Sequence, residues 1–309
     1  MKIYALTALL GISLFLQIDR SMVQQSRVEY VDVYILAGQS NMDGLGLIKE
    51  LPEDLNKVQQ EVYIYNPNRR NDQEEIEEIG YWEALRPGHG SGFSIVGGQS
   101  RYSDKFGVEL SFALKMRELN PAQRIALFKY AKGGASIHPD AAGNWGSWSP
   151  NFTKGNGINQ FDHFSFHLKR AFGWSDIDQD GKKELLRPAG ILWLQGESDA
   201  SYSNEIAGQY KDNLRLLMSE IRALTGVVDL PIVIARISES HMDEDNLLLT
   251  FGDIVRQGQK EFTTEDKNAA YIDAPEGHGW LDPWHYDSAT YIELGNRFAE
   301  KMHTLKHKP

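Results

Sequence analysis

The sequence predicts a three-layer α/β fold in which helices cover both faces of a mainly parallel sheet. Two observations lead to this prediction. Short runs rich in β-branched or aromatic residues are apolar on both faces, as strands buried between two helical layers are. Amphipathic stretches of helix length lie between these runs, and such alternation of strand and helix is typical of a parallel sheet. A chain of 309 residues is also long enough to bury a large core.

The expected elements follow one another regularly along the chain. We expect strands at 31–37, 124–131, 190–194, 231–237 and 270–272. We expect helices at 108–119, 161–172, 206–224, 248–262 and 288–305. The third helix is the clearest, because apolar side chains from Ile206 to Leu224 recur there at spacings of three and four residues.

Two segments interrupt this order. Residues 51–107 contain an acidic run and then a glycine-rich stretch, and residues 136–157 are rich in Gly, Asn, Trp and Pro. Neither has the composition of a linker, so we expect one domain over 27–309 with these two long loop insertions. Long ordered loops often carry binding residues, and open parallel sheets bind ligands at the carboxyl ends of their strands. We therefore look for chemistry just after each strand.

The first 26 residues are predicted to form a signal peptide. Lys2 precedes an apolar run over 3–18, which is shorter than the roughly 20 residues that a spanning helix needs. One positive charge before a short apolar run is the pattern of an export signal. We expect a secreted or periplasmic protein with no membrane contact beyond this segment. A short membrane anchor is the alternative.

The composition argues against several classes of function. The chain has 32 Lys and Arg against 43 Asp and Glu, a net charge of −11, whereas nucleic-acid binding needs clustered basic residues. It has no cysteine, which excludes disulfides, zinc–thiolate sites, iron–sulfur clusters and cysteine nucleophiles. No His-Glu-x-x-His motif indicates a catalytic metal. We expect catalysis without a cofactor.

A serine and a histidine near opposite ends of the chain have neighbours that are typical of a catalytic triad. Ser40 follows the first strand and lies two residues after Gly38, and a glycine there permits a sharp turn that exposes the hydroxyl. From this fragment alone, a serine that caps a helix is the favoured interpretation. Asp282 precedes His285 by three residues, so its carboxylate can bind one ring nitrogen and leave the other to accept a proton. Together they form a Ser…Asp…His series.

Two further strand ends supply groups that a serine nucleophile needs. The second strand runs into Gly133 and Gly134, where a backbone N–H can approach a developing oxyanion, and the third runs into Gln195, a side-chain amide donor. The alternatives are a plain turn and a glutamine that only satisfies backbone groups. Ser100 and Ser198 are rival nucleophiles, because each also stands in a Gly-x-Ser sequence.

Four motifs in this order resemble a known family. GQSNM at 38–42, KGGAS at 132–136, WLQGESD at 193–199 and DPWH at 282–285 resemble the SGNH, or GDSL-like, hydrolases. Within that superfamily the chain is most similar to the sialate O-acetylesterase domain group, which includes carbohydrate esterase family six. The resemblance extends from about residue 31 to the end of the last helix.

The resemblance implies a flavodoxin-like three-layer α/β/α fold. It implies a catalytic triad of Ser40, His285 and Asp282. It also implies an oxyanion hole, formed by the backbone N–H groups of Ser40 and of Gly133 or Gly134 together with the side chain of Gln195.

Substrate contacts are expected beside these motifs. The candidates are motif neighbours and tryptophans of the adjacent loops: Gln39, Asn41, Glu197, Trp145, Trp148 and Trp284. Aromatic rings at the mouth of a polar site can stack on a sugar, although packing within the loops is the alternative for part of this set. Glu197 could tune the histidine or could simply bind backbone amides.

A separate acidic loop begins like a calcium-binding loop. Asp176, Asp178 and Asp180 alternate ahead of Gly181, as they do in an EF-hand. Arg187 stands at the twelfth position, where the EF-hand pattern requires glutamate. A structural calcium site and a plain acidic turn are equally consistent with this segment.

The interpretation that combines these observations is an exported serine esterase that removes O-acetyl groups from carbohydrate. One alternative is a non-catalytic carbohydrate-binding protein on the same scaffold, against which the intact triad argues. Another is a lipase or thioesterase of the same fold, which the polar, tryptophan-rich loops disfavour. The sugar stays open among xylan, sialic acid and sulfated algal polymers.

Overall fold

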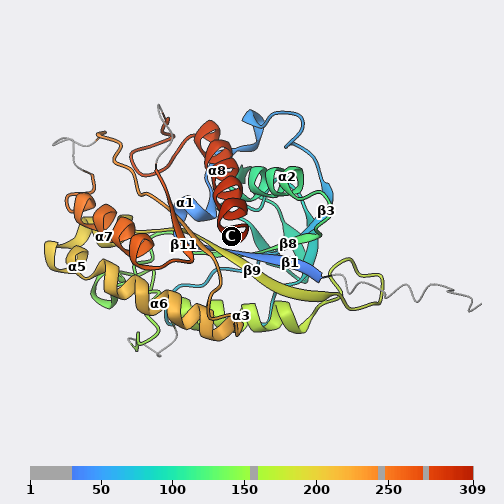
Figure 1. Ribbon diagram of the computed structural model, residues 1–309, viewed down its shortest axis with the longest axis horizontal. Helices are drawn as coiled ribbons and strands as arrows, with labels where there is room; N and C mark the ends of the chain where they lie inside the picture. Colours follow the sequence, from blue (N-terminus) through green and yellow to red (C-terminus); the bar gives the residue numbers. More distant parts are fainter. Residues whose placement is uncertain (1–29, 154–158, 243–247, 274–277, 309) are drawn as a thin grey trace, which may run out of the picture.

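The computed structural model describes residues 30–153, 159–242, 248–273 and 278–308, so the expected signal peptide lies outside the described residues. Its centre is a seven-stranded sheet (Figure 1). In chain order the strands are β1 (Tyr30–Gly38), β3 (Gln59–Tyr65), β4 (Trp82–Leu85), β8 (Ile125–Ala131), β9 (Leu185–Leu194), β10 (Ile232–Ala235) and β11 (Ala269–Ile272). In space they lie in the order β11-β10-β9-β1-β8-β3-β4, and only β3 and β4 pair antiparallel.

The remaining elements flank this sheet. The helices are α1 (Ser40–Asp43), α2 (Glu109–Leu119), α3 (Gln160–Gly173), α4 (Glu197–Tyr202), α5 (Asn204–Gly208), α6 (Tyr210–Thr225), α7 (Gly252–Glu265) and α8 (Ser288–Lys306), with short 3-10 helices η1 (Ile48–Glu50) and η2 (Pro139–Ala141). Two small antiparallel pairs join β2 (Gly46–Leu47) to β7 (Lys105–Phe106) and β5 (Ser94–Val96) to β6 (Gln99–Arg101).

The two faces of β1 belong to two separate cores. Val33 and Ile35 pack with apolar side chains of α3, α6 and α7, whereas Tyr34 and Leu36 pack with those of α2 and α8. Successive side chains of a strand point to opposite faces, so a strand between two helical layers must be apolar throughout. Figure 1 shows α2 and α8 on one side of the sheet and α3 and α6 on the other. The predicted three-layer α/β fold is confirmed.

The order of the strands reverses between β1 and β9, which makes this the switch point of the sheet. If β3 and β4 are set aside, the other five strands follow the flavodoxin-like order 2-1-3-4-5. In such a sheet, chain connections leave β1 and its neighbour toward opposite faces, which opens a crevice at their carboxyl ends. Ser40 begins directly after β1, at this point.

Two sequence expectations differ from the structure. The segment 51–107, expected to be a loop, contributes β3 and the edge strand β4 to the sheet. The sequence did not indicate these strands because they are partly polar and lack a continuous apolar run. The expected helix over 206–224 is two helices, α5 and α6, which meet at Gln209. The domain limits of 27 and 309 stay a prediction.

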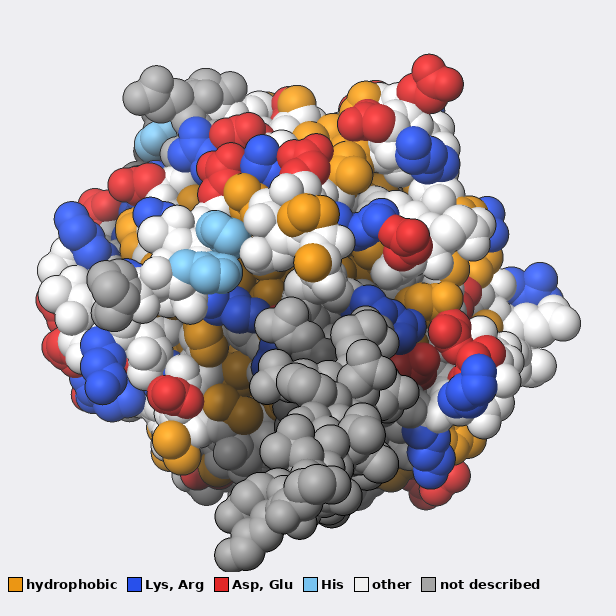
Figure 2. Space-filling model, turned by 45° about the vertical axis from the view of Figure 1, so that its right-hand side comes forward, with side chains coloured by type: hydrophobic (Ala, Val, Ile, Leu, Met, Phe, Trp, Pro, Cys, Tyr) orange, Lys and Arg blue, Asp and Glu red, His pale blue; other side chains and the backbone are white. Residues whose placement is uncertain are grey.

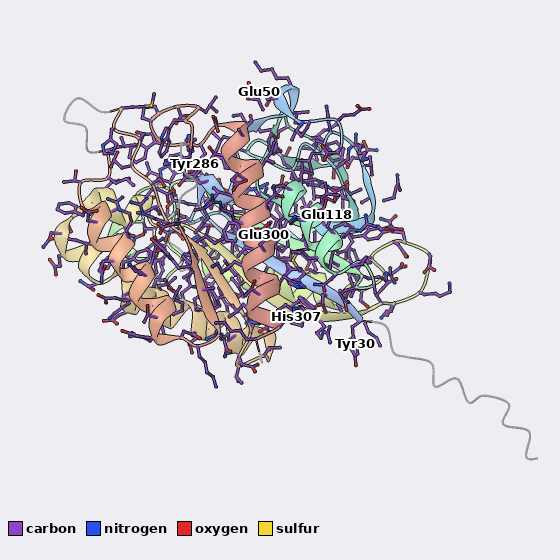
Figure 3. The ribbon with its side chains drawn as sticks, turned by 45° about the horizontal axis from the view of Figure 1, so that its top comes forward. Tyr30, Glu50, Glu118, Tyr286, Glu300 and His307 are labelled. Atoms are coloured by element: carbon purple, nitrogen blue, oxygen red, sulfur yellow. The ribbon has the colours of Figure 1, made fainter. Side chains whose placement is uncertain are left out.

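The surface mixes both signs of charge. On the face in Figure 2, Lys and Arg side chains alternate with Asp and Glu. Figure 3 shows α8 extending from the region of Tyr286, past Glu300, to His307, which lies toward the same end as Tyr30 at the start of β1. Within the described part of the chain, no helix is both long and apolar enough to cross a membrane.

Two buried histidines make stability depend on pH. His163 and His167 lie one turn apart on α3 with almost no exposed surface, and both ring nitrogens of His163 lack partners among the described residues. Burial, reinforced by nearby arginines, lowers the pKa of His163 to about 4 and that of His167 to about 3. The unfolded chain binds protons on these rings near pH 6.5, so the folded state loses relative stability as the pH falls from about 6.5 toward 4.

We therefore predict that the free energy of unfolding falls by roughly 2 kcal/mol or more between pH 7.5 and pH 4.5 through this pair. A double variant, His163→Phe with His167→Phe, should lose less stability over the same range, because phenylalanine does not ionise. Thermal melting at both pH values measures this, with the exposed His307→Gln as a control. An identical loss in the double variant would contradict the prediction.

Candidate active site

The turn that carries Ser40 runs from the end of β1 toward the end of β9. Gly38 has a φ of 152°, and a Cβ atom at this position would lie 2.1 Å from the carbonyl oxygen of Leu194. The backbone N–H of Gln39 donates to the same oxygen over 3.0 Å. Only glycine permits this close approach. The turn therefore places Ser40 directly after β1, as expected from the sequence, and beside the end of β9.

A fully buried lysine supports the far end of this turn. Lys129 of β8 has no exposed side-chain surface, and its ammonium donates to the carbonyls of Asp43 and His89 and to the carboxylate of Glu109, over 2.8, 3.0 and 2.9 Å. Asp43 is the last residue of α1, and its carboxylate forms an ion pair with Arg69. The short helix that begins with Ser40 is thus fixed at its other end by two cations.

Asp282 and His285 form the local pair that their spacing predicted. Both carboxylate oxygens lie within reach of His285 Nδ1, at 2.9 and 2.8 Å. Oδ1 also accepts from the backbone N–H groups of Trp284 and His285. Burial raises the pKa of Asp282, but these hydrogen bonds outweigh it and the net pKa is lowered. The ionised carboxylate keeps the proton on Nδ1 and leaves Nε2 able to accept another.

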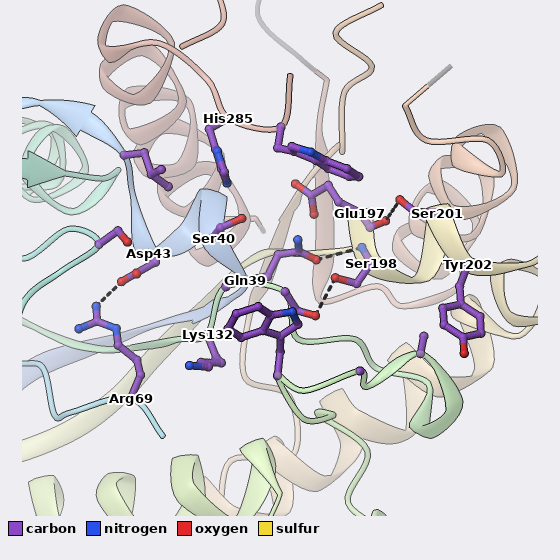
Figure 4. Close-up of a pocket in the computed structure, with 18 of the residues that line it drawn as sticks. Gln39, Ser40, Asp43, Arg69, Lys132, Glu197, Ser198, Ser201, Tyr202 and His285 are labelled. Atoms are coloured by element: carbon purple, nitrogen blue, oxygen red, sulfur yellow. Dashed lines mark hydrogen bonds and ion pairs between the residues drawn. The ribbon is translucent and has the colours of Figure 1, made fainter. Parts of the chain in front are cut away.

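The histidine and the serine meet in one pocket. Figure 4 shows Ser40 and His285 side by side at this pocket, which has a volume of 820 Å³. Besides these two, its lining includes Gln39, Gly133, Gly134, Trp145, Glu197 and Trp284. Asp282 lies behind the imidazole. The structure thus brings together most of the predicted site residues, which come from five separate segments of the chain.

The glycine loop is suited to bind an oxyanion. Neither Gly133 nor Gly134 uses its N–H in a hydrogen bond to another described residue. Gly134 has a φ of 75°, and a Cβ atom there would lie 2.4 Å from the ring of Trp145. Glycine is therefore required at position 134 for the loop to pass close to this ring. The backbone N–H groups of Gly133 and Gly134 can then donate to a bound group.

Gln195 differs from its expected role. Its side chain is fully buried, and its amide nitrogen donates to the carbonyl of Ala135 over 3.2 Å and to Asp199 Oδ2 over 2.7 Å. Asp199 in turn accepts from the backbone N–H groups of Ile137 and His138. Both amide hydrogens of Gln195 are occupied, so this side chain holds the loop after β8 and has no donor left for an oxyanion.

Gln39 is the amide that faces the pocket. Its Oε1 accepts from the N–H groups of Gly196 and Ser198 over 3.3 and 3.4 Å, and Figure 4 shows its carboxamide among the lining side chains. With the oxygen turned to the backbone, the amide nitrogen is the atom that can donate into the cavity. The sequence signalled Gln39 only as a neighbour of Ser40.

Glu197 is a buried carboxyl in the pocket wall. Its Oε1 accepts from Asn41 Nδ2 over 2.7 Å, while Oε2 has no partner among the described residues. Burial raises the pKa of this group, against the opposing effects of Asn41 and of nearby His285. Glu197 therefore gains a proton more readily than an exposed glutamate would.

Two expected substrate contacts are buried instead. Trp148 has no exposed surface, donates from its indole to the carbonyl of Gly38 over 3.2 Å, and packs edge-on against Trp193. Asn41 is 2% exposed, and protein groups occupy its amide. Neither residue lines the pocket, because each side chain is directed to a group of the protein itself. Trp145 and Trp284, at 51% and 41% exposure, stay available to a sugar.

The rival serines have other partners. The hydroxyl of Ser198 donates to the carbonyl of Gly134 over 2.9 Å in the pocket wall. Ser100 lies in β6, where its hydroxyl donates to Glu83 over 2.6 Å. Ser40 is the candidate that shares the pocket with His285 without such a bond in the described structure.

The acidic loop before β9 gathers a different set of carboxylates from the expected one. Asp176, Asp178 and Glu184 present oxygens that all lie within 4.8 Å of one another. Asp180 instead pairs with Lys182 over 2.9 Å, because its side chain turns back to the following residues. Arg124 lies 3.6 Å from Asp178. Calcium binding here stays a prediction.

Comparison with known structures shows the same fold. A protein from Arabidopsis thaliana is 18% identical with a TM-score of 0.61, covering 88% of this chain and 97% of the other. A carbohydrate acetylesterase from Xanthomonas citri is 16% identical with a TM-score of 0.62, covering 89% of this chain and 56% of the other. NanS is 14% identical with a TM-score of 0.59, covering 91% and 99%.

The sequence comparisons identify the family. No protein of curated function matches the chain significantly. A family model described as carbohydrate esterase, sialic acid-specific acetylesterase matches residues 30–304, nearly the whole described chain and all of the motifs discussed above. The resemblance seen in those motifs is confirmed, and the chain belongs to this family of carbohydrate esterases.

Proposed function

We propose that this carbohydrate acetylesterase removes O-acetyl groups by a Ser-His-Asp mechanism, with Ser40 as nucleophile, His285 as general base and Asp282 as its partner. The observation that supports this most is the pair of hydrogen bonds between Asp282 and His285 Nδ1 in a loop whose imidazole shares a pocket with Ser40. A non-catalytic binding protein would have no need of a polarised imidazole beside a serine on a strained turn.

The geometry supports the following steps. Ser40 Oγ attacks the acetyl carbonyl while His285 Nε2 accepts its proton, and the N–H groups of Ser40 and of Gly133 or Gly134 bind the resulting oxyanion. The imidazolium then gives its proton to the sugar oxygen, which leaves as an alcohol. Water, activated by the same imidazole, hydrolyses the acetyl-serine and releases acetate. We propose Gln39 as the side-chain donor to the oxyanion in place of Gln195.

We also propose that the protein acts outside the cytoplasm. The support is the sequence alone: one lysine followed by a short apolar run within the first 26 residues. An acetylated polysaccharide or glycan at the cell exterior would be accessible to an enzyme exported in this way.

The charge in the pocket favours an acidic sugar among the substrates that the sequence left open. Lys132 lies in the pocket wall, donates to Asn71 Oδ1 over 2.9 Å, and forms no ion pair with a carboxylate of the described chain. Burial lowers the pKa of Lys132, and the nearby carboxylates of Glu74 and Asp43 offset only part of this effect. Arg69, the other cation of the wall, is already paired with Asp43. We propose that Lys132 binds a carboxylate or sulfate of the substrate.

The nucleophile is tested by Ser40→Ala. Activity on p-nitrophenyl acetate should fall by roughly 10⁴-fold or more, because loss of a triad member removes the covalent route, while the melting temperature should change little. Ser100→Ala, at the other GQS sequence, should keep full activity. Retained activity in Ser40→Ala with loss in Ser198→Ala would assign the nucleophile to Ser198.

The oxyanion donors are tested by comparing two glutamines. Gln39→Ala should lower kcat by roughly ten- to a hundredfold with little change in KM, because the amide would act on the transition state. Gln195→Ala should instead cost about 1–3 kcal/mol of stability, because buried carboxylate and carbonyl groups lose a donor. Kinetics and melting curves of both variants decide between the roles. A hundredfold kcat loss in a stable Gln195→Ala protein would restore the assignment made from the sequence.

The substrate charge is tested with a matched pair of acetyl esters. An O-acetylated methyl glucuronoside and its carboxamide differ only in the negative charge. Lys132→Met should lower kcat/KM for the acid by roughly tenfold or more and for the amide by less than about twofold. Lys49→Met, the same charge change on exposed η1, is the control. Equal losses on both esters would show that Lys132 acts on the oxyanion and not on the sugar.

A further inference from the structure

The side chain next to the nucleophile makes an unusual set of contacts. Asn41 Nδ2 donates to Glu197 Oε1 over 2.7 Å and to the carbonyl of Trp284 over 3.1 Å. Asn41 Oδ1 accepts from the hydroxyl of Tyr291 over 2.8 Å and from the backbone N–H of Tyr286 over 3.4 Å. One buried amide thus joins the turn after β1, the turn after β9, the loop before α8 and α8 itself.

Two of these bonds lie on either side of the general base. The carbonyl of Trp284 and the N–H of Tyr286 belong to the residues directly before and after His285. Asn41 follows Ser40 directly in the sequence. A single side chain therefore links the nucleophile's own turn to the backbone on both sides of the imidazole. We infer that Asn41 is a positioning residue that sets the place of His285 relative to Ser40, an inference that rests on the proposed function.

Two other contacts of the loop that carries His285 do not connect it to the turn that carries Ser40. Asp282 binds His285 Nδ1 and two backbone N–H groups, but it belongs to the same loop and moves with it. The hydroxyl of Tyr286 donates to the carbonyl of Arg236 over 3.4 Å, which connects the loop to the end of β10 and not to the turn that carries Ser40. Asp282 therefore orients the ring within the loop, whereas Asn41 relates the loop to the serine.

Tyr291 gives the Asn41 amide its orientation. Its hydroxyl is buried in α8, and burial raises the pKa of Tyr291 well above its usual value, so the hydroxyl remains a donor. A donor at Oδ1 directs the NH₂ group of Asn41 toward Glu197 and Trp284, both of which offer acceptors. The amide can satisfy these four partners in one orientation only.

The first experiment compares three variants of the full chain on p-nitrophenyl acetate. Asn41→Ala should lower kcat by roughly ten- to a hundredfold with KM within about twofold, because small displacements of a catalytic group carry losses of this size. Tyr291→Phe, which removes only the orienting hydroxyl, should lower kcat in the same direction by less. Gln59→Ala is the control, because it removes a buried amide at the amino end of β3, far from Ser40.

The second experiment separates positioning from general support. In a His285→Ala background, Asn41→Ala should lower the residual kcat by less than about twofold, because the ring that it positions is gone. The Ser40→Ala protein supplies the background rate. A further tenfold loss in the His285→Ala background, or an unchanged kcat in Asn41→Ala with a melting loss like that of Gln59→Ala, would overturn the inference.

These outcomes are distinct from failure of the proposed function. If Ser40→Ala and His285→Ala both keep full activity, the triad itself is wrong. If both are inactive while Asn41→Ala turns over normally, the triad stands and only the role of Asn41 is refuted.

Discussion

The buried ammonium of Lys129 holds the short helix that begins with Ser40. It has three N–H donors and three acceptors from separate parts of the chain, namely the end of α1, the loop at His89 and the first turn of α2. A charge buried without such partners would cost several kcal/mol, so the three acceptors must remain in place together. Because α1 spans only the four residues from Ser40 to Asp43, holding its end also holds the nucleophile. The glycine contact at Leu194 then fixes the start of the same turn.

Two carboxyl groups near the imidazole have opposite electrostatic environments. Asp282 is partly exposed and accepts several hydrogen bonds, which lower its pKa, whereas Glu197 is enclosed and its pKa is raised. This difference between the two pKa values would let Asp282 balance a developing imidazolium while Glu197 stays closer to neutral. Burial raises the pKa of Glu197, the hydrogen bond from Asn41 lowers it, and burial is the larger effect.

Residues that are neighbours in a motif serve different purposes in the fold. Gln39 presents its amide at the pocket, Ser40 its hydroxyl, and Asn41 turns inward to the histidine loop. The tryptophans divide in the same way: Trp145 and Trp284 are exposed at the pocket, while Trp148 supports Gly38 from below. A tight turn points consecutive side chains in different directions, so adjacency in sequence does not imply a shared role. The exposed rings and Lys132 are the part of the site that can select a sugar.

The sequence by itself determined the fold class, the serine at the end of β1 and the Asp282–His285 pair, because each depends on local pattern: apolar runs, a glycine before the turn and a spacing of three residues. It did not determine β3 and β4, whose partly polar runs become strands only when β3 pairs with β8 and β4 pairs with β3. It also could not tell which amides face the pocket. The partners of Asn41 lie 156 to 250 residues away, and those of Gln195 include a carbonyl 60 residues earlier. Only the folded chain brings these groups together, and each side chain turns toward whichever buried donor or acceptor would otherwise lack a hydrogen bond.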